Sequence, residues 1–402
     1  MDLAHLKSIK DVDVAGKRVL IRVDLNVPLH ESVVTDATRI ERILPALTDL
    51  SDRGARVIVL SHFGRPKGKV VAEFSLKPIA QNMNLMIEGG VGFVDDCIGP
   101  LAEKAAQQMH DGDVVIFENV RFHVGEEAND DAFAKALAAN GEIFVNEAFS
   151  SSHRAHASTD AITRLLPSYA GPLMMAEITA LQAALGDPER PTVALVGGAK
   201  VSTKISVLTN LMDKVDKLII GGGMANTFLQ AQGIDVGTSL AEPDFHETAR
   251  EIMSLAAAKN CELLLPKDVV VATEFKAGAK AETVDVDNVP SGSMILDVGP
   301  ASIEHLAHVL SQCRTLLWNG PMGAFEIDPF GAGTFALANE AAKLTREGKL
   351  TSIAGGGDTV AALNQAGVSE DFSYISTAGG AFLEWLEGRE LPGVAALARQ
   401  PF

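Results

Sequence analysis

The chain has 402 residues, more than a single hydrophobic core usually supports, so we expect two domains. Its formal net charge of -18 disfavours a nucleic-acid-binding or membrane-surface protein, because other polyanions would be repelled. Hydrophobic residues make up 47% of the chain and no segment is of low complexity, which excludes a largely disordered protein.

The cysteines and the N-terminus indicate the compartment. Cys97, Cys261 and Cys313 are far apart and form no CxxC pattern, so we predict buried or semi-buried thiols rather than a disulfide framework or a zinc site. The first residues include acids and lack the apolar run of a signal peptide. No segment offers 18 uncharged apolar residues for a membrane span. We therefore expect a cytoplasmic protein.

Short β-branched runs, each closed by Gly, Pro, Asn or a charge and followed by a helical stretch, are typical of a parallel α/β sheet. In the first half they are residues 18–23, 56–61, 92–95, 113–118 and 142–146. Apolar residues from Leu173 to Ala184 then recur at helical spacing before Gly186 and Pro188. We interpret this helix as an interdomain connector, the alternative being a surface helix inside one domain.

The second half repeats the pattern. Its runs are residues 192–198, 217–223, 261–266, 294–299, 315–320, 351–357 and 374–380. Strands of this number suit two doubly wound sheets better than one very large sheet.

Ligands of open parallel sheets bind beyond the carboxyl ends of the strands, and in the first half those positions are basic and polar. They include Asp24, Asn26, the segments 61–66 and 118–123, and the segment 150–158 with His153, Arg154 and His156. Arginine presents a rigid fork of donors that matches phosphate and carboxylate. A single such residue is more readily explained as a surface Arg or a core His, but four strand ends together predict a site for a small, multiply charged anion. The spacing of His153 and His156 occurs in metal sites, yet no third ligand motif accompanies it and Arg154 opposes a cation.

Glycines follow the second-half strands instead, in segments 197–204, 221–226, 319–323, 355–359 and 378–380. A glycine turn before a helix lets backbone N–H groups approach phosphate oxygens, although close packing of helix on strand also selects glycine. Lys200 and Lys204 are expected on one helical face, within reach of phosphates, and Asp358 is expected to hold the Mg²⁺ of a nucleotide.

Both standard nucleotide fingerprints are missing. The segment at 197–204 lacks the spacing of a P-loop, and the segment at 221–226 lacks the last glycine of GxGxxG. An NAD-dependent sugar-phosphate oxidoreductase needs that second fingerprint, and a nucleotide-sensing binding module leaves the Arg and His cluster unexplained. Phosphoryl transfer between an anion site and a Mg-nucleotide site is the interpretation we favour.

Segments 19–28, 61–66, 118–122, 197–201, 318–325 and 355–359 resemble, in order, the signature segments of the phosphoglycerate kinase family. The resemblance implies an α/β fold of two Rossmann-like three-layer α/β/α domains whose parallel sheets face across a cleft. Residues 1–171 with the return segment 387–402 would bind 3-phosphoglycerate. Residues 172–186 would form the connecting helix, and residues 187–386 would bind the nucleotide. It also implies a monomer.

Site residues are implied by the same resemblance. It implies that 3-phosphoglycerate is held by Asp24, Leu25, Asn26, Arg39, His62, Phe63, Gly64, Arg65, Arg121 and Arg154. For ATP or ADP and its Mg²⁺ it implies Lys200, Lys204, Asn319, Glu326, Gly356, Gly357, Asp358 and Thr359. Direct in-line transfer to the substrate carboxylate would follow hinge closure and would need no general base. Arg39, Lys200, Gly356 and Gly357 would stabilise the transferring group.

The sequence also departs from the family pattern. Thr203 stands where the family usually has Asp, Ser150–Ser152 replace Gly-Thr-Ala, Ala378 replaces a glycine, and Ile295 occupies a place where a glycine often lines the adenine pocket. These departures bear on nucleotide affinity or base selectivity rather than on the reaction.

Overall fold

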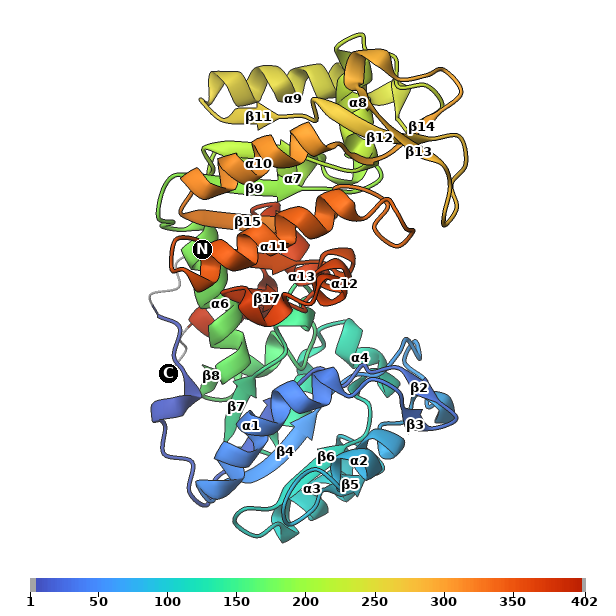
Figure 1. The fold of residues 1–402 in the computed structure, drawn as a ribbon. Coiled ribbons are helices and arrows are strands. Elements are labelled where there is room, and N and C mark those ends of the chain that lie inside the picture. The colour runs from blue at the N-terminus through green and yellow to red at the C-terminus, as the bar shows by residue number, and fades with distance from the viewer. Residues whose placement is uncertain (1–4, 400–402) are drawn as a thin grey trace. The chain divides into compact units, whose positions relative to one another are not determined.

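The computed structural model describes residues 5–399, which form two compact units (Figure 1). The first unit runs to Ile178 and takes in the C-terminal segment from Glu390, and the second is Thr179–Arg389. Helix α6 (Pro172–Leu185) carries the chain from one unit to the other. Residues 1–4 and 400–402, which belong to the predicted first domain and its return segment, lie outside the described residues.

A six-stranded parallel sheet with the order β5-β6-β4-β1-β7-β8 forms the centre of the first unit. Its strands are β1 (Arg18–Arg22), β4 (Arg56–Leu60), β5 (Gly92–Val94), β6 (Val114–Phe117), β7 (Ile143–Asn146) and β8 (Ser168–Ala170). Each predicted run forms a strand, whereas the short strand β8 was not predicted. From β1 the chain continues to β4 on one side, and from β7 to β8 on the other, so the strand order reverses between β1 and β7.

Helices cover this sheet and bury regularly spaced apolar residues. The helices are α1 (Thr38–Asp52), α2 (Lys77–Met83), α3 (Gly99–Gln108), α4 (Val124–Glu127), α5 (Asp131–Ala138) and α14 (Pro392–Ala398). Short 3₁₀ turns are η1 (Ile9–Asp11), η2 (Ala72–Phe74), η3 (Val120–Phe122), η4 (Phe149–Ser151) and η5 (Ala161–Arg164), and β2 (Leu29–His30) with β3 (Val33–Val34) forms a hairpin. Helix α1 buries Ile40, Ile43 and Leu47, the spacing of one helical face. Helix α14 docks closely, since the Gly393 N–H donates to the Ser152 carbonyl at 2.9 Å.

The second unit has its own six-stranded parallel sheet, in the order β11-β10-β9-β15-β16-β17. The strands are β9 (Thr192–Val196), β10 (Lys217–Ile220), β11 (Glu262–Leu264), β15 (Thr315–Asn319), β16 (Thr351–Gly355) and β17 (Tyr374–Ser376). Here the order reverses between β9 and β15, because β9 leads to β10 and β15 leads to β16. The predicted fold class of two parallel α/β units is confirmed.

One predicted strand was assigned to the wrong sheet. Residues 294–299 form β14 (Met294–Val298), which pairs antiparallel with β12 (Asp268–Ala272) in a three-stranded sheet completed by β13 (Ala281–Asp285). Apolar residues of β12 and β14 pack into two small clusters outside the main core. The run at 294–299 therefore has the composition of a buried parallel strand without belonging to the main sheet. Strands β12 and β13 were not predicted.

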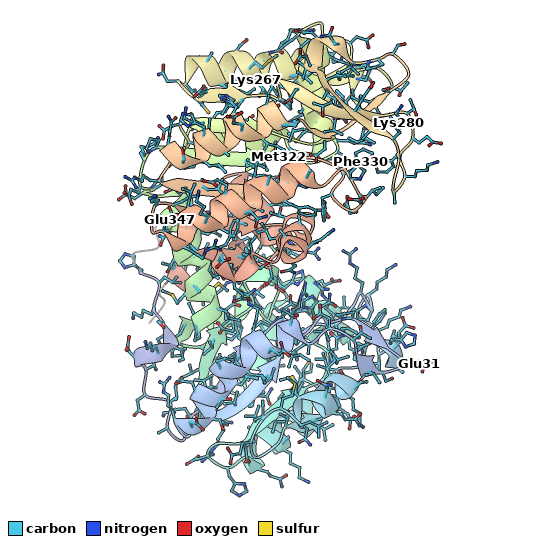
Figure 2. All side chains as sticks on the ribbon, viewed as in Figure 1. Glu31, Lys267, Lys280, Met322, Phe330 and Glu347 are labelled. Atoms are coloured by element: carbon cyan, nitrogen blue, oxygen red, sulfur yellow. The ribbon has the colours of Figure 1, made fainter. Side chains whose placement is uncertain are left out.

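The helices of the second unit complete its layers, and α10 and α11 run along the sheet in Figure 1. The helices are α7 (Ile205–Leu211), α8 (Gly223–Ala231), α9 (His246–Ala258), α10 (Pro300–Gln312), α11 (Ala332–Arg346), α12 (Gly357–Ala366) and α13 (Gly380–Leu386), with 3₁₀ turns η6 (Val201–Thr203), η7 (Pro243–Phe245), η8 (Val286–Asn288) and η9 (Ser369–Asp371). Figure 2 shows all side chains, among them Met322 and Phe330, which are fully enclosed in the core, and Lys267 and Lys280, which are exposed. Within residues 5–399 no helix is long and apolar enough to cross a membrane, and all three cysteines are buried as predicted.

Candidate functional site

In the first unit the predicted substrate residues follow β1, β4, β6 and β7, except Arg39 in α1, and the strand order reverses between β1 and β7. Loops at such a point splay apart and leave room for a ligand. Hydrogen bonds join them here: the Gly64 N–H donates to Asn26 Oδ1 at 2.9 Å, and the Leu25 N–H donates to Ser61 Oγ at 2.9 Å. The segments after β1 and β4 therefore form one continuous rim.

Arg39 reaches this rim from the first turn of α1. Its Nη1 donates to Asp24 Oδ2 at 2.9 Å and to the Asn26 carbonyl at 3.0 Å, and its side chain is 38% exposed. Ser150 Oγ donates to the same Asp24 oxygen at 2.5 Å. The Asp24 carboxylate thus orients Arg39 while leaving part of the guanidinium open to solvent.

Beneath the rim lies a cluster of buried basic groups. Arg22, His62, Arg121 and His156 are between 0% and 9% exposed. Burial, together with the neighbouring Arg22 and Arg121, holds the pKa of His62 well below its ordinary value. Burial and the guanidinium groups of Arg121, Arg22 and Arg154 lower the pKa of His156 to about 3.

Arg121 is also a buried basic group with a neighbouring guanidinium group. Burial, with the nearby Arg22, lowers its pKa to about 10. Its Nη1 donates to the Gly64 carbonyl at 2.9 Å, while its buried Nε lies 3.3 Å from a Glu127 carboxylate oxygen without forming a hydrogen bond. Buried cations that depress one another's pKa values are stabilised by a bound anion.

The other predicted substrate residues have varied surroundings. Arg65 is exposed, and Arg154 Nε donates to His153 Nε2 at 3.2 Å, beside the cluster. Leu25 and Phe63 are buried in the core of the first unit, and the Phe63 carbonyl accepts from Asn119 Nδ2 at 2.7 Å. The side chains of Leu25 and Phe63 therefore stabilise the loops rather than offering groups to a ligand.

Arg22, Glu126 and Ser158 were not among the predicted site residues, although Ser158 ends the predicted polar segment 150–158. Arg22 closes the apolar run of β1, which is a signal that sequence reasoning could have used. Glu126 is fully buried and accepts a hydrogen bond from Ser158, and no local pattern marks it.

In the second unit the glycine segments after β9 and β15 meet at the other reversal of strand order. A Cβ on Gly197 would lie 1.9 Å from the Pro321 carbonyl oxygen, and one on Gly320 would lie 2.2 Å from the Gly197 carbonyl oxygen. These glycines let two loops cross in contact, so close packing rather than phosphate binding explains glycine at these two positions. The glycines that leave room for a ligand are found elsewhere.

Helix α12 begins at glycines that leave room for a ligand. Gly356 is its N-cap with φ +98°, and a Cβ on Gly357 would meet no atom within 4 Å. The N-terminal N–H groups of a helix carry partial positive charge and suit phosphate oxygens. Asp358 is exposed in this first turn, whereas the Thr359 hydroxyl is buried and accepts from the Gly320 N–H at 2.7 Å. The side chain of Thr359 is therefore occupied in fixing the neighbouring loop.

The two lysines do not lie on one helical face, so that prediction was wrong. Lys200 is the extended N-cap of η6, and Lys204 lies between η6 and α7, because the chain makes a 3₁₀ turn there before the α-helix starts. Lys204 Nζ donates to Asn319 Oδ1, and Asn319 Nδ2 donates to the Gly355 carbonyl at 2.7 Å. Burial lowers the pKa of Lys204, which the Asp358 and Glu387 carboxylates partly offset. Lys204 and Asn319 thus connect the loops after β9, β15 and β16.

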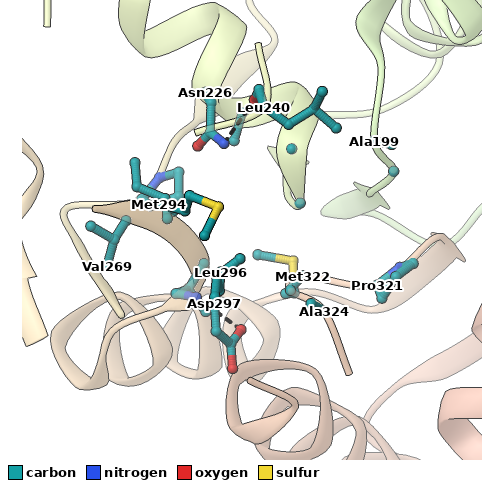
Figure 3. A pocket seen from close by; sticks show the side chains of 18 of the residues that line it. Ala199, Asn226, Leu240, Val269, Met294, Leu296, Asp297, Pro321, Met322 and Ala324 are labelled. Carbon is teal, nitrogen blue, oxygen red and sulfur yellow. Dashed lines mark hydrogen bonds between the residues drawn. The ribbon is translucent and has the colours of Figure 1, made fainter. Parts of the chain in front are cut away.

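Beside these loops lies a pocket of about 440 Å³ lined mainly by apolar groups, including Ile295, Met294, Leu240 and Phe275. Figure 3 shows Met294 and Met322 on one side of it and Leu240 on the other. Glu326 and Asp358 also line it. Its buried Asp297 accepts from the Gly333 N–H at 2.8 Å, and burial raises the pKa of this carboxyl to about 7. A flat apolar ring system fits such a pocket.

The residues that depart from the predicted family pattern have local roles. Thr203 Oγ1 donates to the Lys200 carbonyl at 2.8 Å, Ile295 lines the pocket, and Ala378 is buried before the N-cap Gly379 of α13. Of the three serines, Ser150 contacts Asp24 and Ser152 contacts α14.

Within residues 5–399 one group of three potential metal ligands has its donor atoms within 4.8 Å of one another: Asp96, Cys97 and His123. His123 Nε2 lies 2.8 Å from Asp96 Oδ1, and burial raises the pKa of the Cys97 thiol well above its ordinary value. The hydrogen bond between Asp96 and His123 explains this group as a structural contact between two loops. Asp358, an exposed carboxylate at a helix N-terminus, suits Mg²⁺, which prefers one or two carboxylates with water and phosphate oxygens.

Comparisons with known proteins agree with this geometry. The family model described as phosphoglycerate kinase matches residues 9–389. A phosphoglycerate kinase of Chelativorans sp. (strain BNC1) is 61% identical over 99% of this chain and 100% of its own, and one of Methylorubrum extorquens (strain PA1) is 62% identical over 96% of each. The structure of phosphoglycerate kinase from Coxiella burnetii is 44% identical with a TM-score of 0.92, and that from Pyrococcus horikoshii OT3 is 28% identical with a TM-score of 0.81, each covering 98% of both chains. The chain therefore belongs to the phosphoglycerate kinase family.

Proposed function

We propose that the first unit binds 3-phosphoglycerate and the second binds Mg-ATP or Mg-ADP, and that a phosphoryl group passes directly between them. Family membership supplies the reaction, which is reversible transfer between ATP and the carboxylate of 3-phosphoglycerate to give ADP and 1,3-bisphosphoglycerate. Each unit of this chain contributes its own residues to that reaction.

A single observation carries the assignment of the acceptor: two arginines and two histidines are buried together beneath the rim. His62 and His156 are surrounded by the guanidinium groups of Arg22 and Arg121. Such an arrangement is costly without a counter-charge, and a ligand bearing a phosphate and a carboxylate provides one. We assign the ligand's anionic groups to Arg39, Arg65, Arg121 and Arg154 together with His62, with Asn26 and the Gly64 backbone completing the rim. Asp24 orients Arg39.

The nucleotide is assigned to the second unit. Its base would occupy the apolar pocket with Ile295 and Met294, and Glu326 at the pocket edge could accept hydrogen bonds from the ribose. Its phosphates would accept from the N–H groups at the start of α12 and from Lys200 and Lys204. Asp358 would hold Mg²⁺, which supplies charge neutralisation on the phosphate oxygens when bound.

The attacking group of the acceptor is a carboxylate, which is ionised at neutral pH and needs no general base. Catalysis then depends on alignment and on stabilising the charge of the transferring group. Arg39 of the first unit and Lys200 of the second are assigned this stabilising role, with the N–H groups of Gly356 and Gly357. Because the two ligands are assigned to different units, transfer requires the units to bring them together and to exclude water.

A coupled assay with purified protein, Mg-ATP and 3-phosphoglycerate tests the assignment, repeated with Asp358→Ala. We expect ADP formation that depends on 3-phosphoglycerate and is strongly reduced in the variant. ATP hydrolysis at the same rate without 3-phosphoglycerate would overturn the proposal. Small-angle scattering tests closure: both ligands together should make the protein more compact, and an unchanged radius of gyration would count against it.

A further inference from the structure

Glu126 is a completely buried carboxylate for which the reaction has no use. It lies in the short helix α4, and its side chain has no exposed surface. Burying a lone carboxylate is strongly unfavourable, so a position like this one requires a compensating partner. The groups that surround it connect it to the proposed substrate residue His62.

The connection runs through Ser158 and Arg22, both also fully buried. Glu126 accepts from Ser158 twice, from Oγ at 2.6 Å and from the backbone N–H at 3.0 Å. Ser158 Oγ accepts from Arg22 Nε at 2.9 Å. Arg22 Nη2 lies 3.0 Å from His62 Nδ1, and Nη1 donates to the Val23 carbonyl.

The chemistry of these groups fixes the direction of every hydrogen bond. A guanidinium only donates, so Ser158 Oγ must accept from Arg22 and must use its own hydrogen toward Glu126. For the same reason His62 Nδ1 must be an unprotonated acceptor. A neutral imidazole then carries its hydrogen on Nε2.

We propose that Glu126 and Ser158 are positioning residues, which hold Arg22 so that His62 keeps the tautomer protonated at Nε2 and presents this group as a neutral donor to the acceptor substrate. The inference rests on the proposed function, since it concerns how that site prepares one of its ligand-binding groups. His62 contributes a hydrogen bond rather than a charge, and the arginines contribute the charge.

The charges around these groups support a neutral His62 among charged arginines. The guanidinium groups of Arg22, Arg121 and Arg39 all act on His62 as positive neighbours. Glu126 and Asp24 are the carboxylates that act on Arg22, and His156 Nδ1 lies 3.8 Å from Glu126 Oε1. A second proton on His62 would point an N–H group at Arg22 Nη2, so the imidazolium form is excluded by contact as well as by charge.

NMR of the histidine ring nitrogens in isotopically labelled full-length protein, without substrate, measures this tautomer directly. Wild type is expected to show His62 protonated at Nε2 and unprotonated at Nδ1 from about pH 5 to about pH 8. Ser158→Ala should give a mixture of tautomers or a protonated ring at the acidic end, and Ser158→Thr, which keeps the hydroxyl, should restore the wild-type pattern. Wild-type protein with the hydrogen on Nδ1 would overturn the proposal whatever the variants do.

Kinetics provide the second readout. Ser158→Ala is expected to raise KM for 3-phosphoglycerate about ten-fold with kcat changed by less than about two-fold, because a misdirected donor loses a hydrogen bond to an anion. Glu126→Gln should move KM in the same direction. Ser302→Ala is the matched control, since Ser302 also donates from N and Oγ to a buried carboxylate, Asp268, but in the second unit. An equal rise of KM in the control, or an unchanged KM and tautomer in Ser158→Ala, would refute the positioning role.

The two readouts separate this proposal from the proposed function. If purified protein transfers no phosphoryl group to 3-phosphoglycerate, the proposed function fails, while the tautomer measured without substrate still decides the arrangement of Arg22 and His62. If turnover is normal but the tautomer is the other one, only the present inference fails.

Discussion

The groups proposed to bind anions in the first unit are side chains, whereas those proposed in the second are mostly backbone N–H groups at the start of a helix. In the first unit Arg22, Arg121 and two histidines are buried together, and burial with the neighbouring guanidinium groups lowers the pKa values of Arg121, His62 and His156. In the second, Gly356 and Gly357 lie at the start of α12, and Lys200, Lys204 and Asp358 add charge. A side-chain site is sensitive to removal of charge, and a backbone site is sensitive to added volume and to the conformation of its glycines.

The largest expected effect is on the side-chain site. Arg39→Ala should lower turnover by about 10³-fold while leaving nucleotide binding nearly intact, because the guanidinium stabilises the transferring group and belongs to the first unit. The coupled assay and a nucleotide titration measure the two quantities. Arg56→Ala is a suitable control, since Arg56 lies at the opposite end of the sheet in an exposed pair with Asp111. An Arg39→Ala enzyme that keeps about a tenth of the wild-type rate would contradict the assignment.

The second-largest effect is expected for the proposed metal ligand of the second unit. Asp358→Ala should reduce turnover about 10²-fold and shift the Mg²⁺ requirement to higher concentration, because the carboxylate holds the ion that neutralises phosphate charge. Chelation of Mg²⁺ should stop the wild-type reaction, and added Mg²⁺ should restore it. Asp371→Ala, an acidic residue of the same unit that pairs with Arg346, should leave the Mg²⁺ dependence unchanged. Equal Mg²⁺ dependence in all three proteins would remove Asp358 from the site.

A smaller effect is expected from the glycine turn. Gly356→Ala should destabilise the protein by about 1–3 kcal/mol and weaken nucleotide binding, because φ is +98° and the new Cβ would meet Asn319 Nδ2 at 2.6 Å. Urea unfolding and nucleotide titration are the measurements. Gly348→Ala also has positive φ, but open space around it, and should cost about 1 kcal/mol without affecting the nucleotide. Indistinguishable behaviour of the two variants would mean that the α12 turn has no special role.

The smallest effect concerns one buried carboxyl in each unit. Burial raises the pKa of Glu147, which accepts from the Leu173 and Met174 N–H groups at the start of α6, to about 7, and the pKa of Asp297 also to about 7. A raised pKa means that the folded state binds the proton more tightly than the unfolded chain does. The stability that each of these two carboxyls contributes is therefore fully present below its unfolded pKa and is lost as pH rises through about 7.

Glu147→Gln and Asp297→Asn should each remove part of that fall, on the order of 1 kcal/mol between about pH 5 and about pH 8. Urea unfolding across this range measures the difference from wild type. In Glu347→Gln the slope should not change in this way, because a hydrogen bond from Lys349 lowers the pKa of that exposed carboxyl instead. Parallel pH profiles for wild type and both buried-site variants would disprove the raised values.

Sequence reasoning was most successful where a strand is central. Both faces of β1, β4, β9 and β15 are buried, so their runs are continuously apolar and easily found. The edge strand β8 has three residues and a partly exposed pattern, and β13 is almost wholly exposed, so neither has a distinctive signal. The run at 294–299 was assigned to the wrong sheet because the hydrophobic pattern of a strand indicates that it is buried but not which strands it pairs with.

The positions of the candidate site residues in the fold were predictable to a similar extent, while their roles stay predictions. Arg39, His62, Arg121 and Asp358 follow strands or begin helices, and position along the chain suffices to propose them. Lys200 and Lys204 were placed on a helical face because their spacing fits an α-helix, whereas the 3₁₀ turn η6 intervenes. Ser158 accepts a hydrogen bond from Arg22 and Glu126 acts on Arg22 electrostatically, each from more than a hundred residues away, so only the folded structure brings them together.

Titration of each ligand into separate variants tests most directly the central proposal that the two units bind different ligands. Calorimetry would measure 3-phosphoglycerate and Mg-ADP binding to wild type, Arg121→Ala and Asp358→Ala. We expect Arg121→Ala to lose affinity for 3-phosphoglycerate alone, and Asp358→Ala to lose affinity for Mg-ADP alone. Loss of the nucleotide in Arg121→Ala, with 3-phosphoglycerate still bound, would contradict the assignment of the acceptor to the first unit.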